Sequence, residues 1–441
     1  MRPVALLVFL LVTCSGWCTS PAVLQWNADD IRASWSKPHS IDARHVRMPD
    51  AGDAQDLNIV LHDGPSHITV LAGRQLTPLD QIRLRSKIAT SPQFTRDGRY
   101  VFLSTVDGWV SKVDLQRLGT ISEIRVGAHV QSMAISGDGR YIAVANSQPQ
   151  TVVILDADLR FQKLIPVRDR SGKFESRVSS VLTLASRQSF VVALTDIAEV
   201  WEISYNPTAP EIPLGVIHDF QYREGAFAPG FLNPVRTTLA FPLQEFTVIP
   251  GTDEILAAST DASTLNVVNL DVRRPIARWQ FSDAVDLGRG HSWIQQNATI
   301  LATASKNENS LHFIDLGTGK SFARLQYPGR IQFLLGHDEG DHLWVVCASP
   351  GMDTSTVSIV EKTSLNTVNS FSPIPGKRLN HLTTSRHGDY FVASVEGRDG
   401  LVIAYDTHSL QEIKRLRVYK PKEIFNVPNS IGSRQGMASV D

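Results

Sequence analysis

The feature that most constrains this chain is a motif that returns after roughly 40 residues. Asp-Gly-Arg-Tyr occupies 97–100 and again 138–141; the two copies lie 41 residues apart, and each stands directly before an apolar run. A degenerate copy, His-Gly-Asp-Tyr, occupies 387–390. Asp-Gly between apolar runs favours a tight hairpin, because glycine accepts the positive φ that such turns need. The sequence therefore repeats one hairpin-containing unit.

A second mark, an apolar strand that ends in an acidic residue, recurs along the chain. The acids are Asp114, Asp156, Asp271, Asp315, Glu361 and Asp406. Where these marks are consecutive they lie 42, 44, 46 and 45 residues apart, within or close to the spacing of four-stranded propeller blades. An aspartate at a strand end can accept hydrogen bonds from the backbone of the following turn, so we interpret the mark as structural.

These marks predict an all-β fold, an eight-bladed β-propeller. The eight predicted units span residues 57–87, 91–127, 129–167, 177–217, 239–281, 290–327, 330–373 and 378–418. The segment 205–237 is rich in proline and glycine, and we expect a long inserted loop there, between the fourth and fifth units. Residues 423–427 form a short apolar segment that is expected to pair with the first blade and close the ring.

Composition excludes several classes of protein. A hydrophobic content of 42% and a charged content of 20% are ordinary for a soluble globular chain. Lys and Arg (43) balance Asp and Glu (44), so no summed positive field is present and nucleic acid is not an expected partner. Cys347 is the one cysteine outside the N-terminal region. Disulfides, cysteine-based metal sites and covalent c-type haem are therefore not expected.

The N-terminus is typical of an export signal. Arg2 precedes an apolar run from Val4 to Thr13, which is too short for a bilayer span of about 20 residues. We predict a signal peptide and a periplasmic location. An alternative is a lipoprotein signal in which Cys14 is lipidated, which is also the only membrane attachment expected. The predicted parts are the signal peptide 1–22, an N-terminal arm 23–55, the propeller 56–430 and a flexible tail 431–441.

Four segments carry a resemblance to a known family. They are SPQFTRDGRYVFLSTVDGWVSKVDL (91–115), GAHVQSMAISGDGRYIAVANSQPQTVVILDADL (127–159), SRVSSVLTLASRQSFVVALTDIAEVWEISY (176–205) and KPKEIFNVPNS (420–430). The first three resemble successive blades of the haem d1-binding domain found in cytochrome cd1 nitrite reductase and in the biosynthesis protein NirF. The last resembles the closing strand of the reductase. The resemblance implies an eight-bladed propeller that binds haem d1 non-covalently.

Three residues carry over from the family pattern as candidates for the haem d1 site. Arg177 and Arg378 stand where the family has arginines, and guanidinium groups suit the carboxylates on the rim of haem d1. His337 stands where the reductase has a distal-pocket histidine, so the resemblance makes it the candidate for facing the iron or the reacting edge and for a catalytic role. The alternatives are an exposed loop histidine and arginines in surface or inter-blade salt bridges.

Further cofactor-binding candidates follow from the same comparison. Arg289 lies in a Gly-Arg-Gly triplet like one in the reductase, but Asp286 stands where the reductase has its second distal histidine. His291 is the candidate substitute for that histidine. His381, three residues after Arg378, is expected to face the same pocket.

The iron ligand is where the sequence departs from the family. Thr90 occupies the position of the proximal histidine of the reductase, and no histidine occurs from 68 to 128. His62 and His67 are the remaining candidates for the iron ligand. The electron-donating cytochrome c domain of the reductase is also absent from this sequence.

The resemblance implies first a periplasmic, NirF-like protein of dissimilatory nitrite reduction (denitrification). It would bind haem d1 or a late precursor and act in its biogenesis or in its delivery to a nitrite reductase. One alternative is a catalytic haem d1 subunit that receives electrons from a separate cytochrome c. Another is a protein-binding propeller scaffold that has lost the haem site, an alternative kept open by the missing proximal histidine. Whether the chain is an enzyme stays open.

Overall fold

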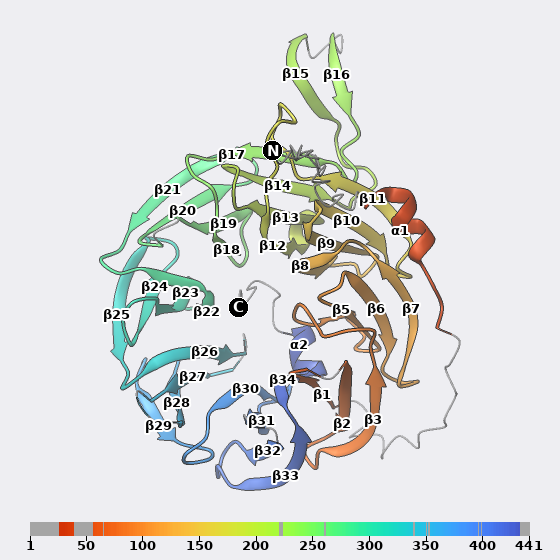
Figure 1. Cartoon of the computed structure of the whole chain (residues 1–441). Coiled ribbons are helices and arrows are strands. Elements are labelled where there is room, and N and C mark those ends of the chain that lie inside the picture. The colour runs from red at the N-terminus through yellow and green to blue at the C-terminus, as the bar shows by residue number, and fades with distance from the viewer. Residues whose placement is uncertain are drawn as a thin grey trace, which may run out of the picture.

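The computed structural model describes residues 26–38, 56–64, 66–219, 224–259, 262–337, 340–349, 351, 353–395, 397 and 399–432. Within these residues, eight four-stranded antiparallel sheets follow one another around a central axis (Figure 1). The predicted eight-bladed β-propeller is therefore confirmed. The helices and the two-stranded sheet that stand outside the blades are additions to this ring.

The first four blades each have four strands, in order from the innermost to the outermost. Blade 1 holds β34 (Pro421–Asn426), β1 (Leu57–His62), β2 (His67–Ala72) and β3 (Thr77–Arg83). Blade 2 holds β4 (Gln93–Phe94), β5 (Tyr100–Ser104), β6 (Trp109–Asp114) and β7 (Gly119–Arg125). Blade 3 holds β8 (His129–Ile135), β9 (Tyr141–Gln148), β10 (Gln150–Asp156) and β11 (Phe161–Pro166). Blade 4 holds β12 (Val178–Leu184), β13 (Ser189–Leu194), β14 (Glu199–Ser204) and β17 (Pro234–Thr238).

The second half of the ring repeats the same order. Blade 5 holds β18 (Glu245–Val248), β19 (Glu254–Ala258), β20 (Thr264–Asn269) and β21 (Arg274–Gln280). Blade 6 holds β22 (Val285–Gln295), β23 (Ala298–Ser305), β24 (Ser310–Asp315) and β25 (Lys320–Gln326). Blade 7 holds β26 (Arg330–Gly336), β27 (His342–Ala348), β28 (Ser355–Glu361) and β29 (Thr367–Phe371). Blade 8 holds β30 (Leu379–Thr384), β31 (Tyr390–Val395), β32 (Asp399–Asp406) and β33 (Glu412–Tyr419).

The hydrophobic core lies between the blades. Middle strands such as β13 are buried at every residue, because neighbouring blades cover both faces, and such strands have continuous apolar runs. Outer strands such as β21 and β25 contain only exposed and half-buried residues. Trp201 of blade 4 is fully buried in a cluster that it shares with blade 3. Each blade is therefore stabilised by its neighbours rather than by a core of its own.

The two sequence marks have the expected local roles. Gly98 and Gly139 have φ of 69° and 71° in the hairpins between the first and second strands of blades 2 and 3, as the Asp-Gly turns require. Asp114 accepts hydrogen bonds through Oδ1 from the backbone N–H groups of Gln116 (2.9 Å) and Arg117 (3.1 Å). The acidic residues at strand ends therefore shape turns.

The ring closes by pairing its two ends in blade 1. β34 pairs antiparallel with β1, with Phe425 opposite Ile59, so the predicted closing strand is confirmed. A buried polar network reinforces the closure: Asn426 Nδ2 donates to Asp56 Oδ1 at 2.6 Å, and Tyr390 Oη donates to Asp56 Oδ2 at 2.5 Å. The network joins blade 8 to both strands that close the ring.

The prediction of a long loop between the fourth and fifth units is wrong. β15 (Ile212–Asp219) and β16 (Glu224–Ala228) form a hairpin that projects from the ring (Figure 1). β17 then supplies the outermost strand of blade 4, so the insertion lies inside this blade and the predicted unit 177–217 ends too early. Pro213 and Pro234 lie in edge strands, where a missing N–H is tolerated.

Two α-helices in the described part of the chain lie outside the blades. α1 (Ala28–Ser34) lies at the outer edge beside β7 and β11 (Figure 1), with Ile31 fully buried. α2 (Val427–Gly432) follows the closing strand. The predicted signal peptide with Cys14, and most of the predicted arm and tail, lie outside the described residues. Among the residues that are described, no helix is long and apolar enough to cross a membrane.

Candidate functional site

A cavity of about 2780 Å³ occupies the centre of the ring and is lined by the innermost strand of every blade and by α2. Each innermost strand is entered from the outermost strand of the preceding blade, so all of them run in the same direction along the cavity. We call the end where these strands begin the start rim and the opposite end the end rim. A residue that precedes an innermost strand therefore lies at the start rim, and a residue that follows one lies at the end rim.

Positively charged side chains line the cavity at both rims. Arg96, Arg99 and Arg386 lie at the end rim, and those at the start rim are Lys87, Arg289, Arg330, Lys420 and Lys422. Lys87 pairs with Asp63 (2.7 Å) and Lys422 with Glu423 (3.0 Å). Among the described residues, Arg330 and Lys420 form no ion pair with a carboxylate. The start rim therefore carries cations that remain available to an anionic ligand.

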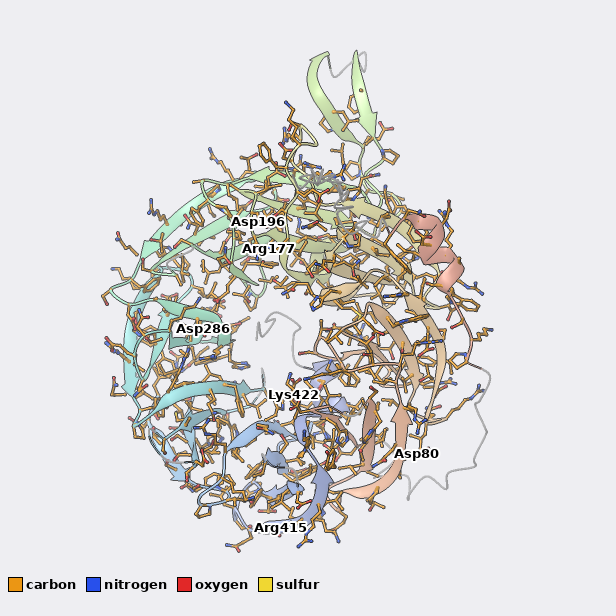
Figure 2. All side chains as sticks on the ribbon, viewed as in Figure 1. Asp80, Arg177, Asp196, Asp286, Arg415 and Lys422 are labelled. Carbon is orange, nitrogen blue, oxygen red and sulfur yellow. The ribbon has the colours of Figure 1, made fainter. Side chains whose placement is uncertain are left out.

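Hydrogen bonds between neighbouring blades hold this rim together. Arg289 forms an ion pair with Asp286 (3.5 Å) and donates through Nη1 to the carbonyl of Ile331 in the next blade at 3.2 Å. Asn380 Nδ2 donates to the carbonyl of Pro421 at 2.6 Å. Figure 2 shows Asp286 beside β22 and Lys422 beside β34 at the central opening. These contacts join blade 6 to blade 7 and blade 8 to blade 1 at this rim.

His381 lines the cavity, as its predicted role requires. Its ring stacks on Phe333, with 5.5 Å between ring centroids, and tilts against Phe425 at 5.1 Å. Nδ1 is buried and has no hydrogen-bond partner within the described residues. Burial lowers the pKa of His381, which favours the neutral ring. An unpartnered buried nitrogen at a cavity wall is a candidate contact for a ligand.

His291 also lines the cavity and its Nε2 is likewise buried and unpartnered within the described residues. A Cβ on Gly336 would lie 2.4 Å from this Nε2, so the absence of a side chain at 336 makes room for the ring. Burial, with the nearby Lys362 and His337, lowers the pKa of His291 to about 3. His291 is therefore a neutral imidazole at neutral pH.

His337 does not line the cavity. It follows β26 at the end rim, where its carbonyl accepts hydrogen bonds from Lys362 Nζ at 2.5 Å and from the N–H of Gly340 at 3.0 Å. Arg177 and Arg378 precede β12 and β30, at the start rim. The structure therefore does not bring these three predicted residues together, because both arginines precede their innermost strands whereas His337 follows its own, and these strands all run in the same direction.

The two predicted arginines are engaged in ion pairs beside the cavity. Arg177 makes a bidentate contact with Asp196, at 3.0 Å from Nε and 2.7 Å from Nη2, and its side chain is 59% exposed; both residues lie on blade 4 (Figure 2). Arg378 pairs with Asp353 at 3.2 Å. Neither arginine lines the cavity; the Arg177–Asp196 pair lies within blade 4, whereas the Arg378–Asp353 pair joins blade 8 to blade 7.

The two predicted iron ligands lack a suitably free nitrogen at the cavity. His62 lines it, but Nδ1 lies 2.7 Å from the carbonyl of Tyr419 and Nε2 lies 2.9 Å from Thr69 Oγ1. His67 is not among the lining residues. Thr90, where the resemblance places the proximal histidine of the reductase, shares a hydrogen bond with Ser104 (2.7 Å). The described residues contain no cluster of three or more His, Cys, Asp or Glu side chains suited to a free metal ion.

Sequence reasoning missed several residues of the start rim. They are Lys87, His129, Arg330, Lys420 and Lys422. Each stands within a few residues of the beginning of an innermost strand. The beginning of an innermost strand recurs in every blade, so the sequence repeat is a signal that identifies these positions.

Comparison with known proteins agrees with this architecture. The family described as cytochrome D1 heme domain matches residues 52–430. The chain belongs to this family. It is 33% identical over 417 residues to a dihydro-heme d1 dehydrogenase of Pseudomonas aeruginosa, covering 94% of this chain and 80% of that relative. It is 23% identical to the protein NirF of the same organism, covering 86% and 93%.

A solved structure supports the same relationship. The dihydro-heme d1 dehydrogenase NirN in complex with DHE matches with a TM-score of 0.81 and 32% sequence identity. The match covers 94% of this chain and 84% of that one. The resemblance drawn from the blade sequences is therefore confirmed at the level of the family.

Proposed function

We propose that this protein binds haem d1 or a late precursor of it non-covalently at the start rim, and that it acts in haem d1 biogenesis in the periplasm. The observation that carries the proposal is the set of basic side chains around the opening of a wide cavity in a chain of the cytochrome d1 haem domain family. Guanidinium and ammonium groups pair strongly with the carboxylates of such a macrocycle.

Arg330 and Lys420 are the principal anchors for these carboxylates. Within the described part of the chain neither forms an ion pair, so a ligand carboxylate displaces none, although the charge of Lys420 acts on the nearby Asp63. Lys87 and Lys422 pair with acids at half-exposed positions, and such pairs are worth only about 0–1 kcal/mol. These two lysines can therefore exchange their partners for a ligand at small cost.

The cavity wall fits a flat, largely apolar macrocycle. Phe333 and Phe425 line it, and the His381 ring lies against both of them. The unpartnered Nδ1 of His381 and Nε2 of His291 are buried, so a ligand would bond either atom only after its ring turned. A buried polar atom without a partner is costly, and such a turn would relieve that cost.

A second candidate function is oxidation of dihydro-haem d1 at the same site. The name of the 33% identical relative suggests it. Removal of two electrons and two protons from the dihydro form would also need an electron acceptor, such as a separate cytochrome c. Delivery of the product to a nitrite reductase fits the same role in biogenesis.

Titration of the purified protein with haem d1, followed in the visible spectrum, tests the proposal. We expect a saturable change whose Kd rises by about 10- to 100-fold in Arg330→Ala/Lys420→Ala, since hydrogen bonds to charged groups contribute about 1.5–3 kcal/mol. Arg177→Ala and Arg378→Ala are matched controls at the same rim and should leave the Kd unchanged. An unchanged spectrum with the wild-type protein would contradict the proposal and favour the scaffold alternative.

Turnover assays separate carrier from catalyst. Spectral conversion of dihydro-haem d1 to haem d1 with an added electron acceptor would establish the dehydrogenase. Nitrite consumption with reduced cytochrome c would instead establish a nitrite reductase subunit. Saturable binding without either reaction would leave a carrier.

A further inference from the structure

The outermost strands of blades 5, 6 and 7 each expose one apolar side chain at the same place in the blade. In β21 the pairing with β20 skips Ile276, which is therefore the extra residue of a β-bulge. The pairing of β25 skips Phe322, and that of β29 skips Val368, in the same way. Their exposed fractions are 48%, 52% and 54%. A bulge redirects a side chain, and here it directs three apolar side chains to solvent on the outer edge of the ring (Figure 1).

On blades 5 and 6 these apolar residues stand between cations. The order cation, apolar residue, cation occurs twice on the exposed face, as Arg274, Ile276, Arg278 and Lys320, Phe322, Arg324. Val272 and Arg273 in the turn before β21 are exposed as well. We call these eight residues the outer patch. It combines apolar and positively charged side chains at alternating positions of two strands.

The acidic side chains nearest to the outer patch are already engaged. Glu308 pairs with Arg324, and Asp271 pairs with Arg187 of blade 4. Asp315 accepts hydrogen bonds from its own turn. Among the described residues, no carboxylate forms an ion pair with the other cations of the patch, which are Arg273, Arg274, Arg278 and Lys320. The outer patch therefore carries net positive charge.

Packing between blades 5 and 6 makes the outer patch one surface. Trp279 of β21 lies against the turn that precedes β25, where a Cβ on Gly319 would lie 2.3 Å from its ring. Trp279 also packs on the buried core that contains Ile314 of blade 6. The two outer strands thus have a fixed relative position. By contrast, the outer edge of blades 2 and 3 is contacted by α1.

We propose that the outer patch binds an anionic phospholipid surface, on which the ring stands by its edge. Phe322 and Ile276 would enter the boundary between headgroups and acyl chains, as the apolar residues of interfacial proteins do. The guanidinium and ammonium groups beside them would pair with lipid phosphates. This proposal goes beyond haem d1 binding and does not depend on it.

The shape and charge of the outer patch favour lipid over a protein partner. The edge of the ring is convex (Figure 1), and cations separate its apolar side chains. A fluid lipid surface adapts to such a shape, whereas a rigid protein partner would need a matching concave surface. A second copy of this chain would bring like charges together across a symmetric contact.

Binding by the edge leaves the haem d1 site free. β21 and β25 lie on the perimeter of the ring (Figure 1), whereas the start rim surrounds the central cavity. Both openings of the cavity would then face sideways, away from the lipid. Lipid binding and haem d1 binding are therefore expected to be independent of each other.

Cosedimentation with vesicles tests the proposal. The purified chain carries Cys14→Ala in every variant, so that no lipid can be attached there. We expect binding to phosphatidylcholine vesicles that contain phosphatidylglycerol, weakened by added salt, and little binding to phosphatidylcholine alone. Arg274→Glu/Lys320→Glu should lower the partition coefficient at least roughly tenfold. Phe322→Ser should lower it about tenfold through loss of apolar insertion.

The matched control is Arg74→Glu/Arg83→Glu, at exposed positions beside and in the outermost strand of blade 1, which stands opposite blade 5 in a ring of eight. It makes the same change in charge and should bind vesicles like the parent chain. Circular dichroism checks that each variant is folded. The Kd for haem d1 should be the same in the patch variants as in the parent, so failure of one proposal is distinguishable from failure of the other.

Three results would overturn the lipid proposal. They are absence of binding to the anionic vesicles, equal binding to both kinds of vesicle, and unchanged binding of Arg274→Glu/Lys320→Glu. Sedimentation velocity supplies a further check. A dimer of the parent chain that dissociates in Phe322→Ser would assign the outer patch to a second copy of the chain instead.

Discussion

Histidine side chains around the central cavity differ in what they can do because their neighbours differ. His62 uses both ring nitrogens for hydrogen bonds to the protein, whereas His381 lies between two phenylalanine rings with a nitrogen left unpartnered. His129 has one nitrogen oriented and a ring that solvent reaches. A sequence with 13 histidines shows none of these differences, because they depend on residues far away in the chain.

Gly336 illustrates how one residue at the wall supports another. A Cβ at 336 would lie 2.4 Å from His291 Nε2, so we expect Gly336→Ala to destabilise the protein by about 1–3 kcal/mol through overpacking. Urea unfolding measures this free energy. In the background of His291→Ala the ring is gone, so the same Gly336→Ala change should cost less. Equal costs in the two backgrounds would show that the ring does not occupy this space.

The sequence repeat predicted individual strands and turns more accurately than it predicted the residues of the site. The Asp-Gly hairpins and the closing strand both form where the pattern placed them. The hairpin β15–β16 and the outer strand β17 were missed, since prolines in 205–237 resemble a loop until one knows that the strands are at sheet edges. Edge strands tolerate residues that central strands exclude, and only the sheet order identifies an edge.

The closing strand depends on a buried polar network, which gives a second stability prediction. Asn426→Leu removes the donor that Nδ2 offers to Asp56 and Asn58 and leaves Asp56 with fewer partners. We expect a loss of about 1–3 kcal/mol, seen as a lower melting temperature. Lys414→Ala on the exposed strand β33 is the control. A melting temperature for Asn426→Leu equal to that of this control would show that pairing with β1 alone closes the ring.

The whole molecule is a ring whose core is shared between blades and whose centre is a cavity lined by titratable groups. Burial in this architecture lowers the pKa of five histidines on blades 1, 6 and 8. They are His62, His67, His291, His312 and His381. Neutral imidazoles are thus built into the folded ring, and stability should depend on pH.

The sign of this dependence follows from proton binding. The unfolded chain takes up protons at these histidines below their ordinary pKa of 6.5, whereas the folded chain resists protonation, for His291 down to about 3. Stability is therefore complete above pH 6.5 and falls as pH decreases towards the folded pKa, by about 2 kcal/mol at pH 5 for a fully buried histidine. Urea midpoints between pH 7.5 and pH 5 measure the effect.

His291→Gln provides the control for this pH series. The variant lacks one of the responsible groups, so its stability should depend less steeply on pH between 6.5 and 5. Carboxylates such as Asp97 and Asp138, whose pKa values are lowered from 3.8, respond only near and below that pH and do not contribute in this window. A wild-type midpoint that stays constant from pH 7.5 to pH 5 would contradict the prediction.

The amino-acid pattern by itself determined the number of blades, the turn chemistry and the family, because the same turn and strand motifs recur in successive units of the chain. Tertiary structure alone decided which residues face the cavity. Arg177 and Arg378 matched a family pattern but pair with Asp196 and Asp353, and His337 lies at the opposite rim. The physical reason is that a cavity wall is assembled from the innermost strand of each blade, so its membership depends on strand order and direction rather than on local sequence.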